Sequence, residues 1–112
     1  MSTDFNIISE IRNDTLVIKT DGYINNTAGE KIVDEFSKNF SGGMKKVVMD
    51  LGKSKVVNSI GISYLIDIIE KLNQSNGKLI FINLDPTIEK TFNIMGIFQF
   101  AEKADSIDSA LE

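Results

Sequence analysis

Ser59 is the residue of this sequence that is best placed to do chemistry, because it stands between a short turn and the start of a predicted helix. Either Asn58 or Ser59 is expected to cap that helix, since the side-chain oxygen of each can accept a bond from one of the first free N–H groups. A serine hydroxyl at this place can alternatively carry a phosphate, which would meet free N–H groups and the positive end of the helix dipole. Gly61 flanks this position.

Other kinds of chemistry are poorly supported by the residue types. The sequence has no histidine and no cysteine, so Ser59 lacks the usual base of a serine nucleophile. Gly52-Lys53-Ser54 resembles the end of a phosphate-binding loop, but Val47 stands where that motif requires glycine. The acids that a metal would need are too scattered to predict a site: Asp21, Asp50, Asp67 and Asp85. We therefore expect no enzyme, no metal and no cofactor.

A buried strand and a long helix are the elements that position Ser59. Lys46–Leu51 is short, rich in β-branched residues and bounded by glycines, which is typical of a strand buried on both faces. From Ser59 to Ser75 the apolar residues recur at helical spacing, and Asn76-Gly77 ends the pattern. Strand, turn and helix therefore meet at Ser59.

The other segments continue this alternation of strands and helices. Phe5–Ile11 and Thr15–Thr20 flank Arg12-Asn13-Asp14 and predict a hairpin at one end of a sheet. A helix is expected over Asn26–Phe40, capped by Asn25, Asn26 or Thr27 and ended by Ser41-Gly42-Gly43. A strand over Gly77–Leu84 follows, and then a helix over Thr87–Met95 with Pro86 in its first turn. The last expected elements are a short strand over Phe98–Ala101 and a helix over Ser106–Leu111. This order predicts an α/β protein with a single mostly parallel β-sheet, an N-terminal antiparallel strand, and helices packed on the sheet.

The predicted central helix carries two apolar rows. The first row is the expected core stripe of Ile62, Leu65 or Ile66, Ile69 and Leu72. The second row starts beside Ser59 at a spacing of i, i+4 and i+8, and consists of Ile60, Tyr64 and Ile68. It fits two alternatives, a helix that is buried on two sides or an apolar docking row for a protein partner beside a phosphoacceptor.

Composition and charge restrict the kind of partner. The 112 residues, 42% hydrophobic and 25% charged, fit one compact domain over residues 1–112. The net charge is −4 and basic residues cluster at most in pairs, which disfavours nucleic acid and anionic membranes as partners. The N-terminal segment lacks the apolar core of a signal peptide, and Asp67 interrupts the longest apolar stretch. We expect a cytoplasmic protein that binds another protein.

Five short segments follow one another in a characteristic order and spacing over nearly the whole chain: Asp50-Leu51, Val57-Asn58-Ser59-Ile60-Gly61-Ile62, Gly77-Lys78-Leu79, Leu84-Asp85-Pro86-Thr87-Ile88 and Met95-Gly96-Ile97-Phe98. Together they resemble the STAS domain of bacterial anti-sigma-factor antagonists. The core motif of that family is Asp-Ser-(Ser or Thr)-Gly-(Leu or Ile), and its first serine is phosphorylated by a partner kinase. Ser59 falls on that serine, whereas Asn58 replaces the aspartate and Ile60 replaces the small hydroxyl residue. A second family turn, Gly-Glu-(Leu or Ile)-Asp, reads Gly22-Tyr23-Ile24-Asn25 here.

The resemblance implies the STAS fold and a binding module rather than a catalyst. It implies that the protein binds an anti-sigma factor with serine kinase activity, that the sigma factor is displaced, and that the partner uses ATP to phosphorylate Ser59 and is then released. A phosphatase acting on phosphorylated Ser59 would restore binding, and the free protein would be a monomer. The residues implied in partner binding are Asn25, Asn58, Ile60, Gly61, Ile62 and Tyr64.

Two other functions remain open. Asparagine keeps the size and hydrogen bonding of aspartate but not its charge, so Asn58 should preserve the local fold, whereas the lost charge bears on kinase recognition or on the field for phosphotransfer. Together with Ile60, it favours a STAS regulatory or structural subunit of a larger complex, lipid-transport or stressosome-like, that is not phosphorylated. A domain or enzyme that binds a small ligand or nucleotide is the third alternative, and the absence of histidine and of a phosphate loop weighs against it.

Overall fold

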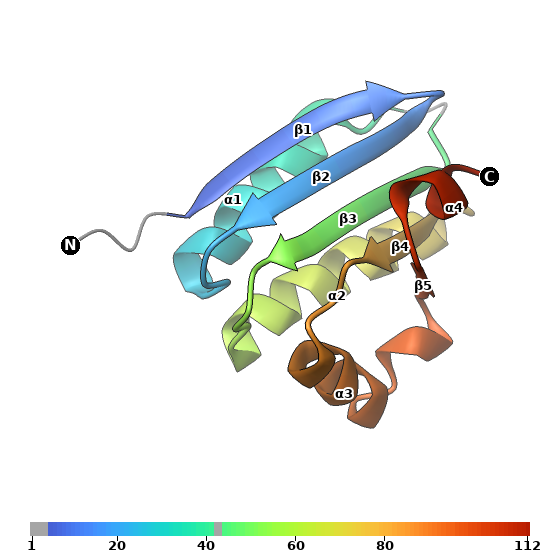
Figure 1. Cartoon of the computed structure of the whole chain (residues 1–112). Helices are drawn as coiled ribbons and strands as arrows, with labels where there is room; N and C mark the ends of the chain where they lie inside the picture. The colour runs from blue at the N-terminus through green and yellow to red at the C-terminus, as the bar shows by residue number, and fades with distance from the viewer. Residues whose placement is uncertain (1–4, 42–43) are drawn as a thin grey trace.

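The computed structural model describes residues 5–41 and 44–112, which form a five-stranded sheet with the strand order β1-β2-β3-β4-β5 (Figure 1). The strands are β1 (Asn6–Arg12), β2 (Thr15–Asp21), β3 (Lys46–Lys53), β4 (Lys78–Ile82) and β5 (Glu102–Ala104). The helices are α1 (Asn26–Asn39), α2 (Ser59–Gln74), α3 (Pro86–Ile94), the 3-10 helix η1 (Ile97–Gln99) and α4 (Ile107–Leu111). Only the pair β1 and β2 is antiparallel, and the other neighbours are parallel, so the predicted fold class is confirmed. Gly42 and Gly43, which are expected to end the first helix, lie outside the described residues.

A two-residue turn creates the antiparallel strand at the N-terminal edge. Asn13 and Asp14 both have positive φ angles, 52° and 63°. Hairpin turns that match the twist of their strands need this conformation at both central residues, and Asn and Asp are among the residues that adopt it at low cost. The turn sets Arg12 opposite Thr15 and thereby fixes the register of the whole hairpin.

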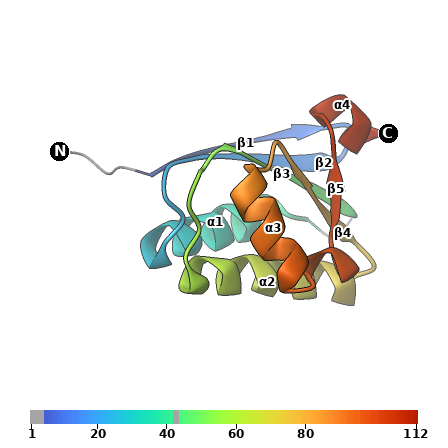
Figure 2. The same ribbon diagram turned by 60° about the horizontal axis from the view of Figure 1, so that its bottom comes forward.

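The sheet is covered unequally on its two faces. Figure 2 shows α1 and α2 along one face and the short α4 on the other. Leu16 and Ile18 of β2 belong to the main core with α1 and α2, whereas Val17 belongs to a smaller cluster with Ala110 of α4. A hydrogen bond from the Lys46 ammonium to the carbonyl oxygen of Ala110, 2.8 Å long, fastens α4 to the start of β3.

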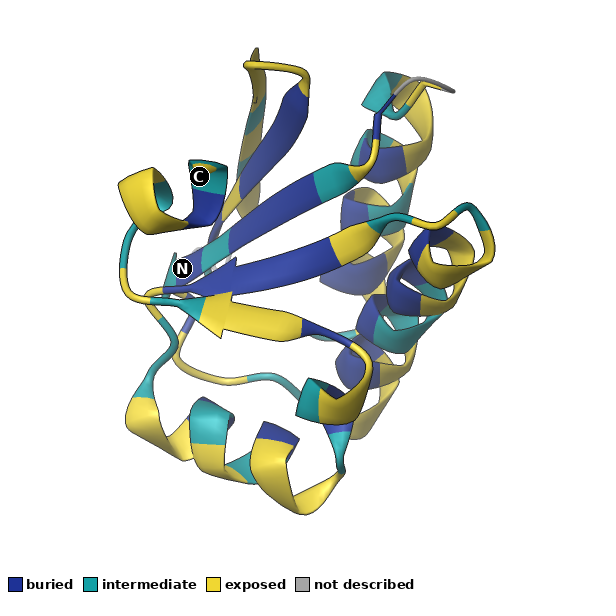
Figure 3. Ribbon diagram, turned by 90° about the vertical axis from the view of Figure 1, so that its right-hand side faces the viewer, coloured by how far each residue is buried: buried dark blue, intermediate teal, exposed yellow. Residues whose placement is uncertain are grey.

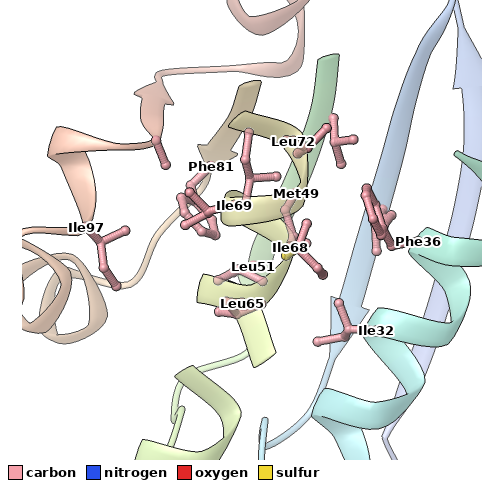
Figure 4. Close-up of a cluster of buried hydrophobic side chains, with 14 of the residues drawn as sticks. Ile32, Phe36, Met49, Leu51, Leu65, Ile68, Ile69, Leu72, Phe81 and Ile97 are labelled. Atoms are coloured by element: carbon pink, nitrogen blue, oxygen red, sulfur yellow. The ribbon is translucent and has the colours of Figure 1, made fainter. Parts of the chain in front are cut away.

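The main core lies between the central strands and the inner side of α2 (Figure 4). Buried side chains from β3 and β4, among them Met49, Leu51 and Phe81, meet Leu65 and Leu72 of α2. Figure 3 shows that β3 and β4 are mostly buried, and residues on both of their faces belong to apolar clusters. The predicted strand with two buried faces is therefore confirmed.

Each α-helix begins after a residue whose side chain accepts a hydrogen bond from the first turn. These residues are Asn25 for α1, Asn58 for α2, Asp85 for α3 and Ser106 for α4. Asn25 is therefore the cap of α1 among the three expected candidates, and Pro86 occupies the first helical position of α3. Among the described residues, no helix combines the length and the apolar character that crossing a membrane requires.

The strand expected over Phe98–Ala101 is wrong. Gly96 adopts a left-handed conformation with φ 76°, which reverses the chain after α3. Ile97 and Ala101 are then both buried, and the N–H of Ala101 donates to the carbonyl of Ile97 at 3.0 Å. Burial four residues apart is the pattern of a helical turn, so η1 forms here and β5 starts only at Glu102.

Replacing Leu65 by alanine should lower the free energy of unfolding by about 2–5 kcal/mol, because the change leaves a cavity in the main core. Leu65 is 0% exposed. The matched control is Ser63→Ala, an exposed position on the same helix, which should change the free energy by less than about 0.5 kcal/mol. Urea unfolding measures both values, and equal losses from the two variants would contradict this packing of α2.

Candidate functional site

Ser59 is exposed at the first position of α2, and Asn58 is the residue that caps the helix. The Asn58 Oδ1 atom accepts the N–H of Gly61 at 2.8 Å, and its backbone carbonyl accepts the N–H of Ile62 at 2.9 Å. Of the two expected caps, Asn58 therefore does the capping. Within residues 5–41 and 44–112 the Ser59 hydroxyl has no hydrogen-bond partner, so it is available to a reagent.

Backbone hydrogen bonds hold the segment before Ser59 against the segment that follows β2. The N–H of Gly22 donates to the carbonyl of Lys53 at 3.0 Å, and the N–H of Ile24 donates to that of Val56 at 3.0 Å. The N–H of Asn58 returns a bond to the carbonyl of Ile24 at 3.1 Å. We call these two joined segments, residues 22–25 and 53–58, the paired loops. They continue the parallel pairing of β2 and β3 beyond the sheet. These hydrogen bonds fix the backbone directly before Ser59.

A buried pair of hydroxyl groups joins the C-terminal end of β2 to the segment that follows β3. The hydroxyl oxygens of Thr20 and Ser54 lie 2.7 Å apart, and the two residues are 3% and 0% exposed. A polar pair of this kind is favourable only while both members are satisfied, because an unpaired buried hydroxyl loses its bonds to water. Thr20 is the next-to-last residue of β2 and Ser54 directly follows β3, so the pair fixes the distance between the loops.

Gly61 has a packing role that its sequence position did not reveal. A Cβ atom at this residue would lie only 2.3 Å from the carbonyl oxygen of Ile24, so only glycine lets α2 lie directly on the paired loops. Ile62 is also buried, at 5% exposed, and belongs to the main core. Both residues are buried, whereas Ser59 is exposed, and contact of either one with a partner stays a prediction.

The starts of α1 and α2 lie side by side, because Ile24 and Val57, each within two residues of a helix start, form a parallel bridge (Figure 1). Asn25 caps α1 through the N–H of Ala28, just as Asn58 caps α2. Neither helix has an acidic residue in its first turn, whereas α3 and α4 have Glu89 and Asp108. Two positive helix ends thus converge near Ser59 without a side-chain charge in their first turns to neutralise them.

Three exposed apolar side chains lie on the paired loops and in the first turn of α2, which begins with Ser59. Tyr23 is 46% exposed, Val56 is 55% exposed and Ile60 is 51% exposed. We call these residues the apolar rim. The sequence reasoning included Ile60 but missed Tyr23 and Val56. Their signal was an alternation that continues past each strand, in which Tyr23 and Val56 point outward and their neighbours Ile24 and Val57 point inward.

The second apolar row of α2 is not a continuous docking row, so that alternative is wrong and the helix is buried on two sides. Ile68 is 0% exposed and belongs to the main core. The Tyr64 ring lies against Gly29 of α1, where a Cβ would come within 2.3 Å of the ring, and its hydroxyl donates to Asn26 Oδ1 at 3.0 Å. Only Ile60 at the start of the row is widely exposed, so the exposed apolar surface at Ser59 extends across the paired loops rather than along α2.

Two of the acids that were considered as metal ligands accept backbone hydrogen bonds instead. Among the described residues, no three acids, histidines or cysteines lie close enough together to hold a metal ion. Asp50 and Asp85, two of the scattered acids, instead accept backbone N–H groups from Gly52 at 2.9 Å and from Thr87 at 3.1 Å. These carboxylates organise turns and a helix start.

A comparison with known families assigns this α/β domain. The model of the STAS domain matches residues 6–110, and the chain therefore belongs to the STAS domain family. A relative, "Putative anti-sigma factor antagonist BtrV" of Bordetella bronchiseptica, is 26% identical over 95 residues, which cover 85% of this chain and 82% of that protein.

Two solved structures agree with this fold. The crystal structure of an anti-sigma factor antagonist from Mycobacterium paratuberculosis is similar with a TM-score of 0.84 and 17% identity, over 99% of this chain and 94% of that one. The phosphorylated form of the Bacillus cell fate determinant SpoIIAA is similar with a TM-score of 0.73 and 22% identity, over 96% of each chain. At these identities the likeness establishes the STAS architecture.

Replacing Gly61 by alanine should destabilise the protein by about 1–3 kcal/mol, because the new methyl group collides with the Ile24 carbonyl. Helix propensity alone predicts the opposite sign, a gain of about 1 kcal/mol. Ser59→Ala, two residues away and exposed, serves as the control and should stay within about 0.5 kcal/mol of the parent. Thermal or urea unfolding decides between the signs, and a stabilised Gly61→Ala protein would refute the close contact.

Proposed function

We propose that this protein is an anti-sigma-factor antagonist that binds an anti-sigma factor with serine kinase activity and is released when Ser59 is phosphorylated. Membership of the STAS domain family supports this function, as does the relative described as an anti-sigma factor antagonist. The likeness to SpoIIAA in its phosphorylated form supports a phosphorylation switch on this fold. In this function the protein is the ligand and the substrate, and its partner supplies ATP and catalysis.

The observation that carries the proposal is the exposed hydroxyl of Ser59 at the meeting point of two positive helix ends. Asn58 leaves that hydroxyl unused because it caps α2 itself. Asn25 and Asn58 are neutral amides, so a phosphate added here would meet favourable helix dipoles without a repelling carboxylate at either cap.

A phosphate at Ser59 would act on the interface rather than on the fold. It would add about −1.5 to −2 charges next to the apolar rim formed by Tyr23, Val56 and Ile60. A partner that covers the rim would have to remove water from that charge, which is costly without a paired cation. The start of α2, by contrast, tolerates the negative charge, so phosphorylation weakens partner binding while the helix stays formed.

The remaining parts of the proposal concern the partners and the surroundings of the protein. Asn25, Asn58, Ile60 and Tyr64 line or flank the partner surface, with Gly61 and Ile62 supporting it from behind. A phosphatase acting on phosphorylated Ser59 returns the protein to its binding form. The free protein acts as a monomer in the cytoplasm, where its kinase partner and the sigma factor are found.

A second candidate function is a STAS regulatory or structural subunit of a larger complex that is not phosphorylated. The substitution of amides for the acids that the family carries at positions 25 and 58, together with the bulky Ile60 after Ser59, favours it. In that function the paired loops and the apolar rim would form a permanent contact instead of a switched one.

Incubation with ATP and the serine kinases of the source organism should add one phosphate to the parent protein and none to Ser59→Ala. Intact-mass spectrometry measures the gain. Ser63→Ala is the matched control, since Ser63 is exposed one helical turn away, and it should accept the phosphate as the parent does. Absence of a mass gain with every kinase, combined with stable recovery of a partner, would replace the switch by the subunit function.

Replacing Ser59 by aspartate should weaken binding to the anti-sigma factor at least about tenfold while leaving the free energy of unfolding unchanged or raised by about 0.3–1 kcal/mol. Isothermal titration and urea unfolding provide the two values. Tyr23→Ala should weaken binding in the same way without adding charge, and Ile11→Ala, at an exposed apolar residue of β1 near the hairpin turn, should leave it unchanged. A partner that binds the aspartate variant as tightly as the parent would rule out the switch.

A further inference from the structure

A groove of about 580 Å³ lies between the C-terminal half of α2 and the turn that follows α3. Its apolar lining consists of Ile66, Ile69, Met95, Ile97 and Phe100, and Gly96 lies among them. Ile66 stands seven residues after Ser59 and Gln74 fifteen residues after it, so the groove begins about 10 Å along the helix and ends about 22 Å along it. The groove is therefore a feature apart from the surface around Ser59.

Large apolar side chains continue outward from the groove. Met95 is 49% exposed, Phe100 is 62% exposed, and Ile94, directly before Met95, is 77% exposed. Exposed apolar side chains that gather in one place, rather than being scattered singly, are typical of a surface that another molecule covers. Since the apolar surface extends beyond the hollow itself, its occupant is larger than a compound that would only fill the groove.

The polar residues of the groove all lie on one wall and include a single charge. Glu70, Asn73 and Gln74 line it from α2, and Glu70 is the only ionisable residue of the lining. Asp67, the other acid on this part of α2, is paired with Lys71 at 3.2 Å, whereas Glu70 has no ion-pair partner within residues 5–41 and 44–112. A positive charge on the occupant would complement Glu70.

The walls of the groove determine what kind of chain can lie in it. They are side chains of α2 and of the turn around η1, without a free strand edge, so an added β-strand would find no backbone partners. From Ile66 to Gln74 the α2 wall runs for about 12 Å, which matches about two turns of a docked helix. We propose that this groove is a second docking surface, one that binds an amphipathic helix of a protein partner through its apolar stripe and through a lysine or arginine placed opposite Glu70.

The probe for this surface is an amphipathic peptide of leucine and lysine, about 14 residues long and helical when bound, compared with the same peptide carrying glutamate for lysine. Amide chemical shifts of the isotope-labelled protein report where each peptide binds. The lysine peptide should saturate the protein and shift Ile69, Gly96 and Phe100, and the glutamate peptide should not. Equal binding of the two peptides, or shifts centred on Ser59, would overturn the proposal.

Variants of the protein distinguish docking of the lysine peptide in the groove from its general electrostatic attraction to an acidic protein. Phe100→Ser should weaken the lysine peptide at least about tenfold, because it removes an exposed anchor without touching the core. Glu70→Gln should weaken it about two- to fivefold, while Asp34→Asn on α1 removes the same charge elsewhere and should have no effect. An unchanged affinity for Phe100→Ser would overturn the proposal, and Ile94→Ser provides a second anchor variant.

Two further measurements keep this surface distinct from the site at Ser59 and from self-association. Ser59→Asp should leave the affinity for the lysine peptide unchanged, so the groove proposal stands or falls apart from the phosphorylation switch. If the same amides shift with protein concentration in the absence of peptide, a second copy of the chain is the occupant and the proposal is wrong.

Discussion

The peptide unit of Ile24 is the constraint on which the start of α2 depends. Its N–H donates to Val56, and its carbonyl accepts the N–H of Asn58. The same carbonyl lies against Gly61, at a distance that a methyl group would not tolerate. One residue in the loop after β2 therefore sets the path of the loop after β3 and the distance between that residue and the start of α2. Because these contacts fix the start of α2, they also fix the exposed position of Ser59.

The convergence of two helix starts gives the site its electrostatic character. In many helices an acidic side chain in the first turn offsets the helix dipole, as Glu89 does in α3. Asn25 and Asn58 satisfy the first N–H groups but bring no charge, so the positive ends of α1 and α2 persist at the surface. Amides at positions 25 and 58 thus cap both helices without adding a negative charge beside Ser59.

Local patterns in the sequence were sufficient for the fold class, the hairpin and the extents of the long elements, because these follow from periodicity and turn residues. Tertiary contacts decided the rest. Spacing alone could not show that Ile68 is buried or that the Tyr64 ring lies against α1, and the second contact depends on the room that Gly29 leaves. The rim residues Tyr23 and Val56 become neighbours of Ser59 only through the pairing of two distant loops. Sequence also left two candidates for the cap of α2, and the bond to Asn58 distinguishes them.

The strands lie in the sheet in the same order in which they occur in the sequence. During synthesis on the ribosome each strand therefore emerges when its neighbour is already present, and no later strand has to be inserted between earlier ones. The β1 and β2 hairpin has the most local contacts and needs no other part of the chain to set its register. The small apolar cluster that contains Val48 and Ile80 stays uncovered until α4 arrives with Ala110. The nascent protein thus grows strand by strand from one edge, and the face under α4 is the last to be shielded from aggregation.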